Sequence, residues 1–309
     1  MKKITLQLSL LAMALTLTFI ACKKNKKENP PATTQDQDGT TAADNSYSEN
    51  AANDLMLIGS QAIDNTNNTL TTYRGTKPTD EVFLISCATV TIDTTLKKVT
   101  VTFNNTVCND GRTRSGSLTY DYSQSTNGAK HYRSPGFKCI ITSTNYVVDG
   151  NAITINNKTI QNTTAVGFNP QTTNLTWTIT SGITITKSGG GVITWNCTRY
   201  KTLVNTSDTT VYKNDLYPIV WSKARIGLTG SASGVTAQGN SYTSTITSQL
   251  IRDFNCAPTA YPHRHPFIQG VTEFTPQGKL TRVIDFGTGT CDMNATLTIG
   301  TYTTTITLH

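Results

Sequence analysis

Three aspartates and two histidines have side chains that could support catalysis or metal binding. His263 and His265 stand two residues apart, so both imidazoles lie on one face if the segment is extended. No third ligand stands nearby and prolines flank the pair, which favours a surface loop over a metal site. Asp110, Asp285 and Asp292 could form an acid–base pair or hold Ca²⁺, but their spacing matches no calcium loop. Turn chemistry is the preferred interpretation of the Gly-Thr-Gly-Thr surroundings of Asp285, and we expect no metal and no cofactor.

Arg112 and Arg114 alternate with Thr113, so both would point to one face of a strand. A cross-strand ion pair is the expected role, and an anion site is the alternative. The chain contains no serine in a Gly-x-Ser-x-Gly context and no glycine-rich phosphate loop before a helix. The sequence therefore favours a non-enzymatic protein, with an envelope hydrolase as the alternative.

Several aromatic residues could line a platform for a glycan. Trp177 and Trp195 share the phase of neighbouring isoleucines, which favours the core. Trp221 and Tyr217 flank Pro218 and are better surface candidates, and Tyr200 completes the set.

Seven cysteines allow a lipid site and a set of disulfides. If Cys22 carries lipid, six remain, and six allow 15 connectivities. An even number in an exported chain predicts disulfides, and the absence of a Cys-x₂-Cys spacing argues against zinc. A weak repeat pairs residues 98–103 and Cys108 with residues 280–286 and Cys291, each preceded by a further cysteine. It favours Cys87–Cys108 and Cys256–Cys291, which leaves Cys139 and Cys197, both on apolar phases.

The chain has 60 threonines among its 309 residues, and many alternate with apolar residues. Val99, Val101 and Phe103 alternate with threonines, as do Leu175, Trp177 and Ile179. This period of two is typical of antiparallel strands with one wet and one packed face. Turn signals include Asp149-Gly150-Asn151, Ser181-Gly182, Ser188–Gly191, Gln238-Gly239-Asn240 and Gln277-Gly278-Lys279. We expect an all-β meander or sandwich of about 12–15 strands over residues 81–309.

One amphipathic helix is expected before the strands, over Asp44–Asp64. Ser46-x-x-Glu49 has the form of a capping box, and Ala51, Leu55, Ile58 and Ala62 form an apolar stripe. The stripe predicts a helix packed against the β domain, with a connector completing residues 44–80.

The N-terminus predicts export and a lipid anchor. Residues 1–21 combine two lysines with an apolar run, as in a signal peptide, and Phe19-Ile20-Ala21-Cys22 resembles the bacterial lipobox. Acylation of Cys22 would add several buried chains, which together form a stable anchor. Residues 22–43 read as the lipidated cysteine followed by a flexible, Pro-rich linker.

The basic charge belongs mostly to this N-terminal segment. The formal net charge is +7, yet six lysines precede residue 28, and the remainder holds 20 basic against 19 acidic residues. No stripe of basic and aromatic residues follows, which argues against nucleic acid as a partner.

Four segments together resemble a family of uncharacterised lipoproteins common in Bacteroidetes: Cys108–Gly116 (CNDGRTRSG), Tyr132–Gly136 (YRSPG), Asn145–Asn151 (NYVVDGN) and Asp285–Asp292 (DFGTGTCD). The resemblance implies a lipid-anchored, β-rich envelope protein and no particular activity. Cys139 and Cys197 are extra to the usual pattern, which fits their being partners of each other. The family's phylum associates surface export with acidic residues after the lipidated cysteine, and Lys23–Lys27 departs from that.

These observations predict an outer-membrane lipoprotein, on either face of that membrane. We expect a non-enzymatic binding or structural module whose partner is the membrane, through lipid, together with an envelope protein or a glycan. A hydrolase or glycan-binding protein is the alternative.

Overall fold

Thirteen strands form one antiparallel sheet in the part of the chain that the structure describes, and each strand pairs with the next along the sequence. The expected all-β class is confirmed, as a meander. The strands are β1 (Ala88–Asp93), β2 (Lys98–Val107), β3 (Thr113–Asp121), β4 (Lys138–Val148), β5 (Asn151–Asn162), β6 (Leu175–Thr186), β7 (Val192–Leu203), β8 (Arg225–Val235), β9 (Ser241–Asp253), β10 (Phe267–Pro276), β11 (Arg282–Thr288), β12 (Asn294–Ile299) and β13 (Tyr302–Thr307).

The computed structural model describes residues 39–66, 87–108, 110–169, 172–204, 208, 211, 219–220, 223–259 and 265–307. The expected signal peptide, the lipobox with Cys22 and most of the expected linker lie outside these residues, as does the connector over 67–80.

Alternation of apolar and polar residues sets the two faces of the sheet. On β7, burial alternates along the whole strand, and the threonines occupy the more exposed positions. Short turns join most strands: Asp149 and Gly150, with φ of 49° and 79°, form the β4–β5 turn. Positive φ at both positions suits the twist of a two-residue hairpin and is tolerated by Asp and Gly.

The expected turn at Ser181-Gly182 is wrong, because β6 runs through both residues. Gly182 pairs with Asn157 on β5 and Asn196 on β7. A Cβ atom at Gly182 would lie 2.8 Å from the side-chain oxygen of each asparagine. A larger residue here would displace one or both asparagine side chains, so Gly182 marks a close approach inside a strand.

Helix α2 (Thr40–Thr66) begins four residues before the expected Asp44. The predicted capping box is therefore wrong: Ser46 and Glu49 lie inside the helix, and Glu49 is buried. Residues 40–43, assigned to the linker from sequence, form the first turn, in which Ala43 N donates to Gly39 O. The expected apolar stripe is confirmed, since all four of its members are buried: Ala51, Leu55, Ile58 and Ala62.

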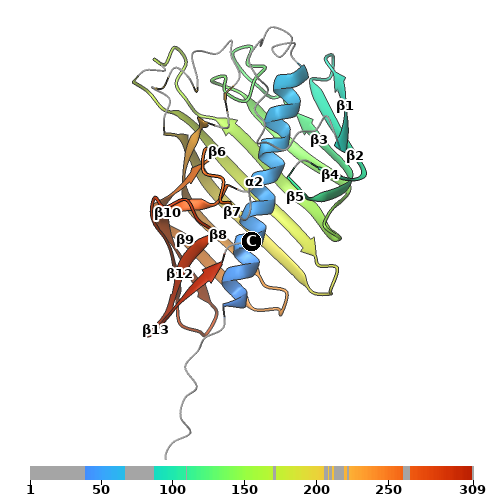
Figure 1. Cartoon of the computed structure of the whole chain (residues 1–309). Coiled ribbons are helices and arrows are strands. Elements are labelled where there is room, and N and C mark those ends of the chain that lie inside the picture. Colours follow the sequence, from blue (N-terminus) through green and yellow to red (C-terminus); the bar gives the residue numbers. More distant parts are fainter. Residues whose placement is uncertain are drawn as a thin grey trace, which may run out of the picture. The chain divides into compact units, whose positions relative to one another are not determined.

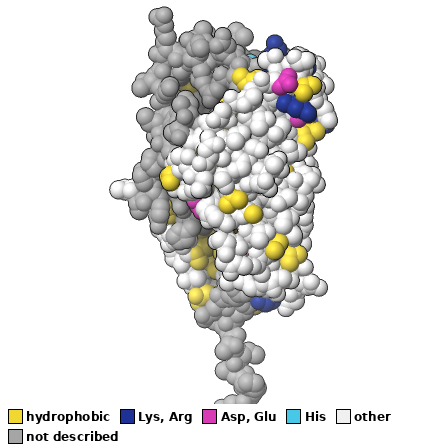
Figure 2. All heavy atoms as spheres, turned by 90° about the vertical axis from the view of Figure 1, so that its right-hand side faces the viewer, with side chains coloured by type: hydrophobic (Ala, Val, Ile, Leu, Met, Phe, Trp, Pro, Cys, Tyr) yellow, Lys and Arg dark blue, Asp and Glu magenta, His cyan; other side chains and the backbone are white. Residues whose placement is uncertain are grey.

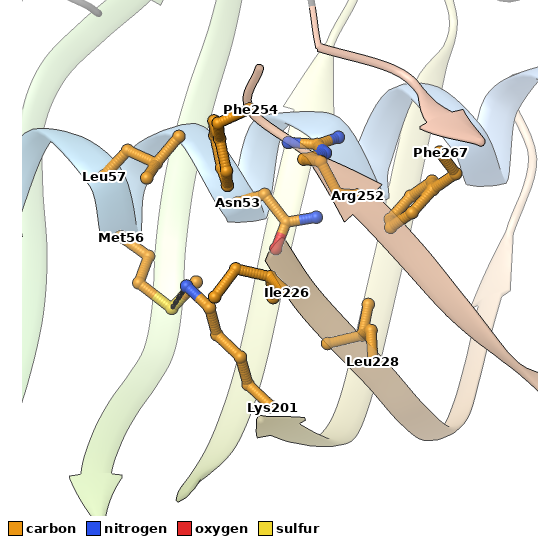
Figure 3. A pocket seen from close by; sticks show the side chains of 9 residues that line it. All are labelled: Asn53, Met56, Leu57, Lys201, Ile226, Leu228, Arg252, Phe254 and Phe267. Atoms are coloured by element: carbon orange, nitrogen blue, oxygen red, sulfur yellow. Dashed lines mark hydrogen bonds between the residues drawn. The ribbon is translucent and has the colours of Figure 1, made fainter. Parts of the chain in front are cut away.

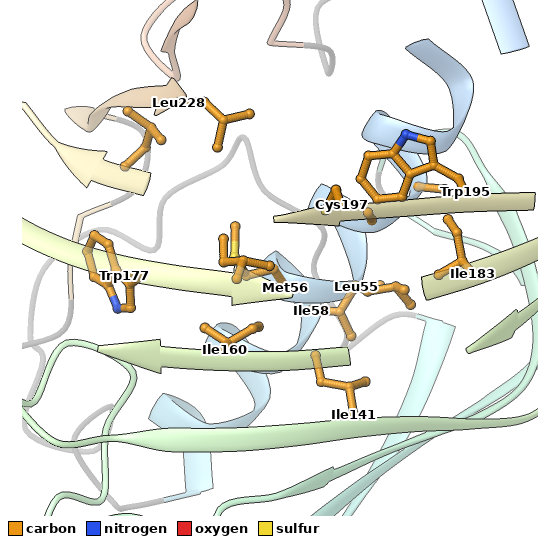
Figure 4. Close-up of a cluster of buried hydrophobic side chains, with 14 of the residues drawn as sticks. Leu55, Met56, Ile58, Ile141, Ile160, Trp177, Ile183, Trp195, Cys197 and Leu228 are labelled. Atoms are coloured by element: carbon orange, nitrogen blue, oxygen red, sulfur yellow. The ribbon is translucent and has the colours of Figure 1, made fainter. Parts of the chain in front are cut away.

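The sheet curves around α2, which lies along its hollow side (Figure 1). Leu55, Met56 and Ile58 of the helix pack among side chains from several strands. Figure 4 shows this core, in which Trp177 and Trp195 sit on opposite sides of the helical cluster. Both tryptophans are buried, as their phase predicted.

We call the side of the sheet that packs against α2 the inner face and the opposite side the outer face. On β7 the inner face holds Ile193, Trp195, Cys197, Arg199, Lys201 and Leu203, and the outer face holds Thr194, Asn196, Thr198, Tyr200 and Thr202. Along β5, β6 and β7, which are described throughout, no Asp, Glu, Lys or Arg points outward. Figure 2, seen from the side of β1–β5, shows a surface in which charged side chains are few.

Tyr120 of β3 fixes the helix against the inner face. Its hydroxyl donates to the Leu55 carbonyl oxygen at 2.8 Å, and the side chain is buried. A Cβ atom at Gly59 would lie 2.2 Å from Cε1 of Tyr120. Gly59 therefore forms a notch in α2 that admits the phenol ring.

Candidate functional site

Two disulfides tie the ends of the meander. Cys87 bonds Cys108 and Cys256 bonds Cys291. The first joins the residue before β1 to the residue after β2, and the second joins the β9–β10 connector to the β11–β12 connector. Both pairs predicted from the weak repeat are confirmed.

The expected third bridge is wrong, because Cys139 and Cys197 are free and buried. Cys139 lies on β4 and Cys197 on β7, with β5 and β6 between them. Three strand spacings amount to about 14 Å, twice the Cα separation that a disulfide spans. Burial raises the pKa of both thiols, that of Cys197 to about 12, so both remain protonated near neutral pH.

Asp110, Arg112 and Arg114 come together, although not as the expected cross-strand pair. Arg114 donates two hydrogen bonds to the Asp110 carboxylate, at 2.8 and 2.6 Å. Arg112 forms an ion pair with Asp54 of α2. Burial alone would lower the pKa of Arg114, but the hydrogen bond and charge of Asp110 outweigh it and raise that pKa. The cluster therefore joins the β2–β3 hairpin to the helix, and its carboxylates are already engaged.

Asp285 lies within β11, Asp292 and His265 lie in connections between strands, and all three make local contacts. The Asp285 carboxylate accepts from Gly287 N at 2.8 Å, and Asp292 accepts from Asn294 N at 2.7 Å. The Nδ1 atom of His265 lies 2.8 Å from the Cys256 carbonyl oxygen. The contact of Asp292 agrees with the turn chemistry that the sequence favoured, whereas Asp285 lies in a strand, and the three aspartates are divided between the β2–β3 and β11–β12 hairpins. His263, Tyr217 and Trp221 lie outside the described residues.

The inner face carries charge that sequence reasoning missed. Arg199 of β7 donates to the Glu49 carboxylate of α2, with Nη2 at 2.7 Å and Nε at 3.1 Å from Oε2. Lys187 pairs with Asp44 at 2.5 Å near the start of the helix. Three carboxylates of α2, namely Asp44, Glu49 and Asp54, thus face three cations of the sheet side.

Three further cations of the inner face donate hydrogen bonds to neutral groups. Lys158 Nζ donates to Ser181 Oγ at 3.4 Å, and Lys201 Nζ donates to the Tyr132 hydroxyl at 3.4 Å. Arg252 Nη2 donates to Asn50 Oδ1 of α2 at 2.9 Å.

Aromatic rings lie close to two of these cations. Lys201 Nζ lies 5.4 Å from the centroid of Tyr132 and 5.6 Å from that of Trp177. The guanidinium carbon of Arg252 lies 4.8 Å from the ring centroid of Phe267. Such faces attract cations, and they offset part of the cost of burying the charge.

Burial lowers the pKa of all three cations, and the Glu49 carboxylate opposes this effect at Lys158 and Arg252. Burial lowers the pKa of Lys158, and burial together with the charges of Arg252 and Lys158 lowers the pKa of Lys201 well below its usual value. Burial also lowers the pKa of Arg252 to about 10, still high enough to keep the guanidinium charged at neutral pH. The inner face therefore concentrates positive charge in a low-dielectric region.

A small hollow lies between α2 and strands β7–β10 (Figure 3). Its volume is about 10 Å³, close to the minimum that holds one water molecule. Lys201 and Arg252 line it with polar groups, and the remaining walls come from Asn53, Met56, Leu57, Ile226, Leu228, Phe254 and Phe267. Asn53, Leu57 and Arg252 are only half-buried, so the hollow reaches the surface beside the helix.

The sequence contains a pattern that predicts charged side chains on the inner face. Arg199 and Lys201 continue the phase of Trp195 and Cys197, so strict alternation places both charges on the packed face. A charged residue on an apolar phase breaks the usual pattern, and such breaks concentrate at functional sites. Arg252 likewise shares the phase of Tyr242, Ile246 and Leu250 on β9.

Among the described residues, no group of three His, Cys, Asp or Glu side chains could hold a metal ion. The helix that the structure describes is also not long and apolar enough to cross a bilayer. No family model matches the chain, and neither a curated protein nor a solved structure does so.

Proposed function

We propose that the protein is a lipid-anchored binding module of the bacterial cell envelope. Cys22 follows an export signal in a lipobox-like context, and that position carries the proposal. Two disulfides in the folded unit support it, because disulfides persist in oxidising compartments outside the cytoplasm. A binding role fits the engaged carboxylates, since Asp110, Asp285 and Asp292 hold local partners.

Fractionation of Cys22→Ala tests the anchor. We expect the parent chain to sediment with membranes and to take up labelled palmitate, and the variant to do neither. Cys139→Ala is the matched control, because it removes a cysteine that is free and buried in the folded unit. Membrane association of Cys22→Ala equal to that of the control would refute the proposal.

Glycan binding through the outer face is the second candidate, and Tyr200 favours it. Its side chain is 53% exposed, on a strand whose outward residues carry no charge. Thr178 and Thr229 are its cross-strand neighbours. An exposed ring among hydroxyls offers a stacking surface with hydrogen-bonding groups around it.

Affinity electrophoresis in gels containing a neutral polysaccharide tests this candidate. We expect the parent chain to be retarded and Tyr200→Ala to migrate as in a gel without polysaccharide. Tyr302→Ala, on β13, serves as the control. Equal retardation of both variants would argue against a site at Tyr200.

A further inference from the structure

Strand β9 contains a bulge in the middle of the sheet. Between the pairs Leu228–Leu250 and Gly230–Ile246, β8 advances by two residues and β9 by four. The pairing of β9 with β10 shifts over the same stretch. Two additional residues of β9 therefore leave the regular ladder, and the three residues at this point are all exposed: Thr247, Ser248 and Gln249. Bulges of this kind re-aim side chains and are frequent beside functional sites.

Glycines on both neighbouring strands make room for the bulge. Gly230 of β8 and Gly270 of β10 have φ of 113° and 105°. A Cβ atom on Gly270 would lie 2.2 Å from the Gln249 carbonyl oxygen, and one on Gly230 would lie 2.2 Å from the Thr198 carbonyl oxygen. Both positions combine a backbone conformation that favours glycine with a close backbone neighbour. Three adjacent strands are therefore shaped around this bulge.

The bulge lays the side chain of Gln249 across the outer face of β8. A Cβ atom on Gly227 would lie 2.4 Å from Nε2 and 3.1 Å from Oε1 of Gln249, and Gly227 is buried beneath this amide. Gly227 pairs with Thr202 of β7, and Tyr200 pairs with Thr229 of β8. The amide thus lies over a β8 residue that is only two positions, about 7 Å, from the residue opposite Tyr200. One small ligand could contact both the ring and the amide.

The groups around Tyr200 have the chemistry that a neutral sugar needs. The exposed ring offers a surface on which the apolar face of a pyranose can stack. The Gln249 amide and the neighbouring threonine hydroxyls both donate and accept hydrogen bonds, as sugar hydroxyls do. Arg225 is the charged side chain among the outward residues of β6–β8, and it pairs with Asp253 at 3.3 Å. The composition of this patch therefore favours a neutral ligand over an anion.

We propose that Tyr200 and the β9 bulge form a subsite for one neutral sugar unit of a glycan. The sugar ring stacks on Tyr200, and the Gln249 amide hydrogen-bonds to its hydroxyl groups. The inference rests on the glycan-binding candidate above and deepens it. It adds Gln249 as a second recognition group and Gly227 as the residue that positions the amide.

Affinity electrophoresis of the full chain carrying Cys22→Ala tests the subsite, in gels that each contain one neutral polysaccharide. The probes are a glucan, a mannan, a galactan and a xylan, and the Kd is measured with the one that retards the chain most. Gln249→Ala removes the amide. Gly227→Ala keeps the amide but displaces it, because the new methyl group occupies its place. We expect each variant to raise the Kd about fivefold to tenfold.

Two matched variants serve as controls. Gln238→Ala, in the β8–β9 turn, and Gly189→Ala, whose added Cβ meets no atom within 4 Å, should bind as the parent chain does. The atoms that Gly227→Ala would displace belong to the end of a flexible side chain, so its Tm should stay within about 2 °C of the parent's. Weaker binding at an unchanged Tm would separate displacement of the amide from unfolding.

The possible outcomes distinguish the subsite from the broader glycan-binding candidate. Parent-like binding by either Gln249→Ala or Gly227→Ala, with binding lost in Tyr200→Ala, would overturn the subsite and leave the candidate standing. Migration of the parent chain unchanged in all four gels would refute the candidate and the subsite together. Fractionation of Cys22→Ala measures the anchor separately.

Discussion

The inner and outer faces of the sheet differ in how they use polar residues. On the inner face, charged groups lie in the core, and most have defined partners, as Arg199 has in Glu49. On the outer face of β5–β7, polarity comes from hydroxyls and amides that water can satisfy. The same strands carry both, since side chains alternate between faces.

The two faces also differ in the free-energy cost of losing a polar partner. A charge on the inner face depends on a particular partner, because burial removes its hydration. A hydroxyl on the outer face loses little when its neighbour changes, because water replaces the lost hydrogen bond. Substitutions should therefore have large effects inside and small effects outside, and the predictions below test that contrast.

Glu49→Gln should have the largest effect. It removes the counter-ion of Arg199, whose side chain is 3% exposed, and an uncompensated buried charge costs about 3–5 kcal/mol. We expect urea unfolding, followed by tryptophan fluorescence, to show that loss in the free energy of unfolding.

The surface pair Lys98–Asp121 provides the control, at 3.3 Å with both side chains partly exposed. Asp121→Asn should cost less than about 1 kcal/mol. Similar losses for the two variants would contradict the contrast between the faces.

The strands were predictable from the sequence because their burial follows a simple period. Val99, Val101 and Phe103 are buried, as their alternation with threonine predicted. The start of α2 was not predictable, because Ser46 and Glu49 imitate a cap. Residues 40–43 are helical although the local signal favoured a linker, and Thr41 and Ala42 are buried against the rest of the fold. Tertiary packing here overrides the local signal.

Gly59→Ala tests how closely the inner face fits the helix. In an exposed helix interior this change would stabilise by about 1 kcal/mol. Here the new methyl group would meet the buried ring of Tyr120, at 2.2 Å, so we expect a net loss of about 1–3 kcal/mol. Denaturant unfolding measures the sign.

Gly189→Ala is the matched control for this prediction. No atom lies within 4 Å of its added Cβ, so the effect should stay within about 0.5 kcal/mol. A stabilised Gly59→Ala would show that the helix and Tyr120 are not in close contact.

Lys201→Met should stabilise the fold at neutral pH, because it removes a buried charge that other cations repel. We expect a gain of about 1 kcal/mol. The folded pKa of Lys201 lies below its unfolded value of about 10.4, so the parent chain gains stability as pH rises between these two values. Methionine does not titrate, and the advantage of the variant should therefore shrink as pH rises.

Urea unfolding of both chains at several pH values, without added anions, measures this difference. An advantage that grows with pH would show that the charged form of Lys201 stabilises the fold.

The site was less predictable than the fold, for geometric reasons. Alternation predicts that Cys139 and Cys197 both point inward, but it does not predict how many strands separate them in the sheet. The pairing of Arg199 with Glu49 joins residues 150 positions apart, and only the placement of α2 on the sheet brings them together. Local pattern gives the face of a residue but not its partner.

Two neighbouring residues of β6 allow the inner and outer faces to be compared within a single strand. Ser181 points inward and accepts a hydrogen bond from Lys158 at 3.4 Å, and Thr180 is exposed. Ser181→Ala should cost about 1 kcal/mol, because the buried amine loses its acceptor. Thr180→Val keeps the β-branched shape and should change the free energy of unfolding by less than about 0.5 kcal/mol. Both positions lie in one strand between the same two neighbouring strands, so a difference between the two variants reports the difference between the inner and outer faces. Equal effects would mean that strand position, and not burial of the polar group, sets the cost.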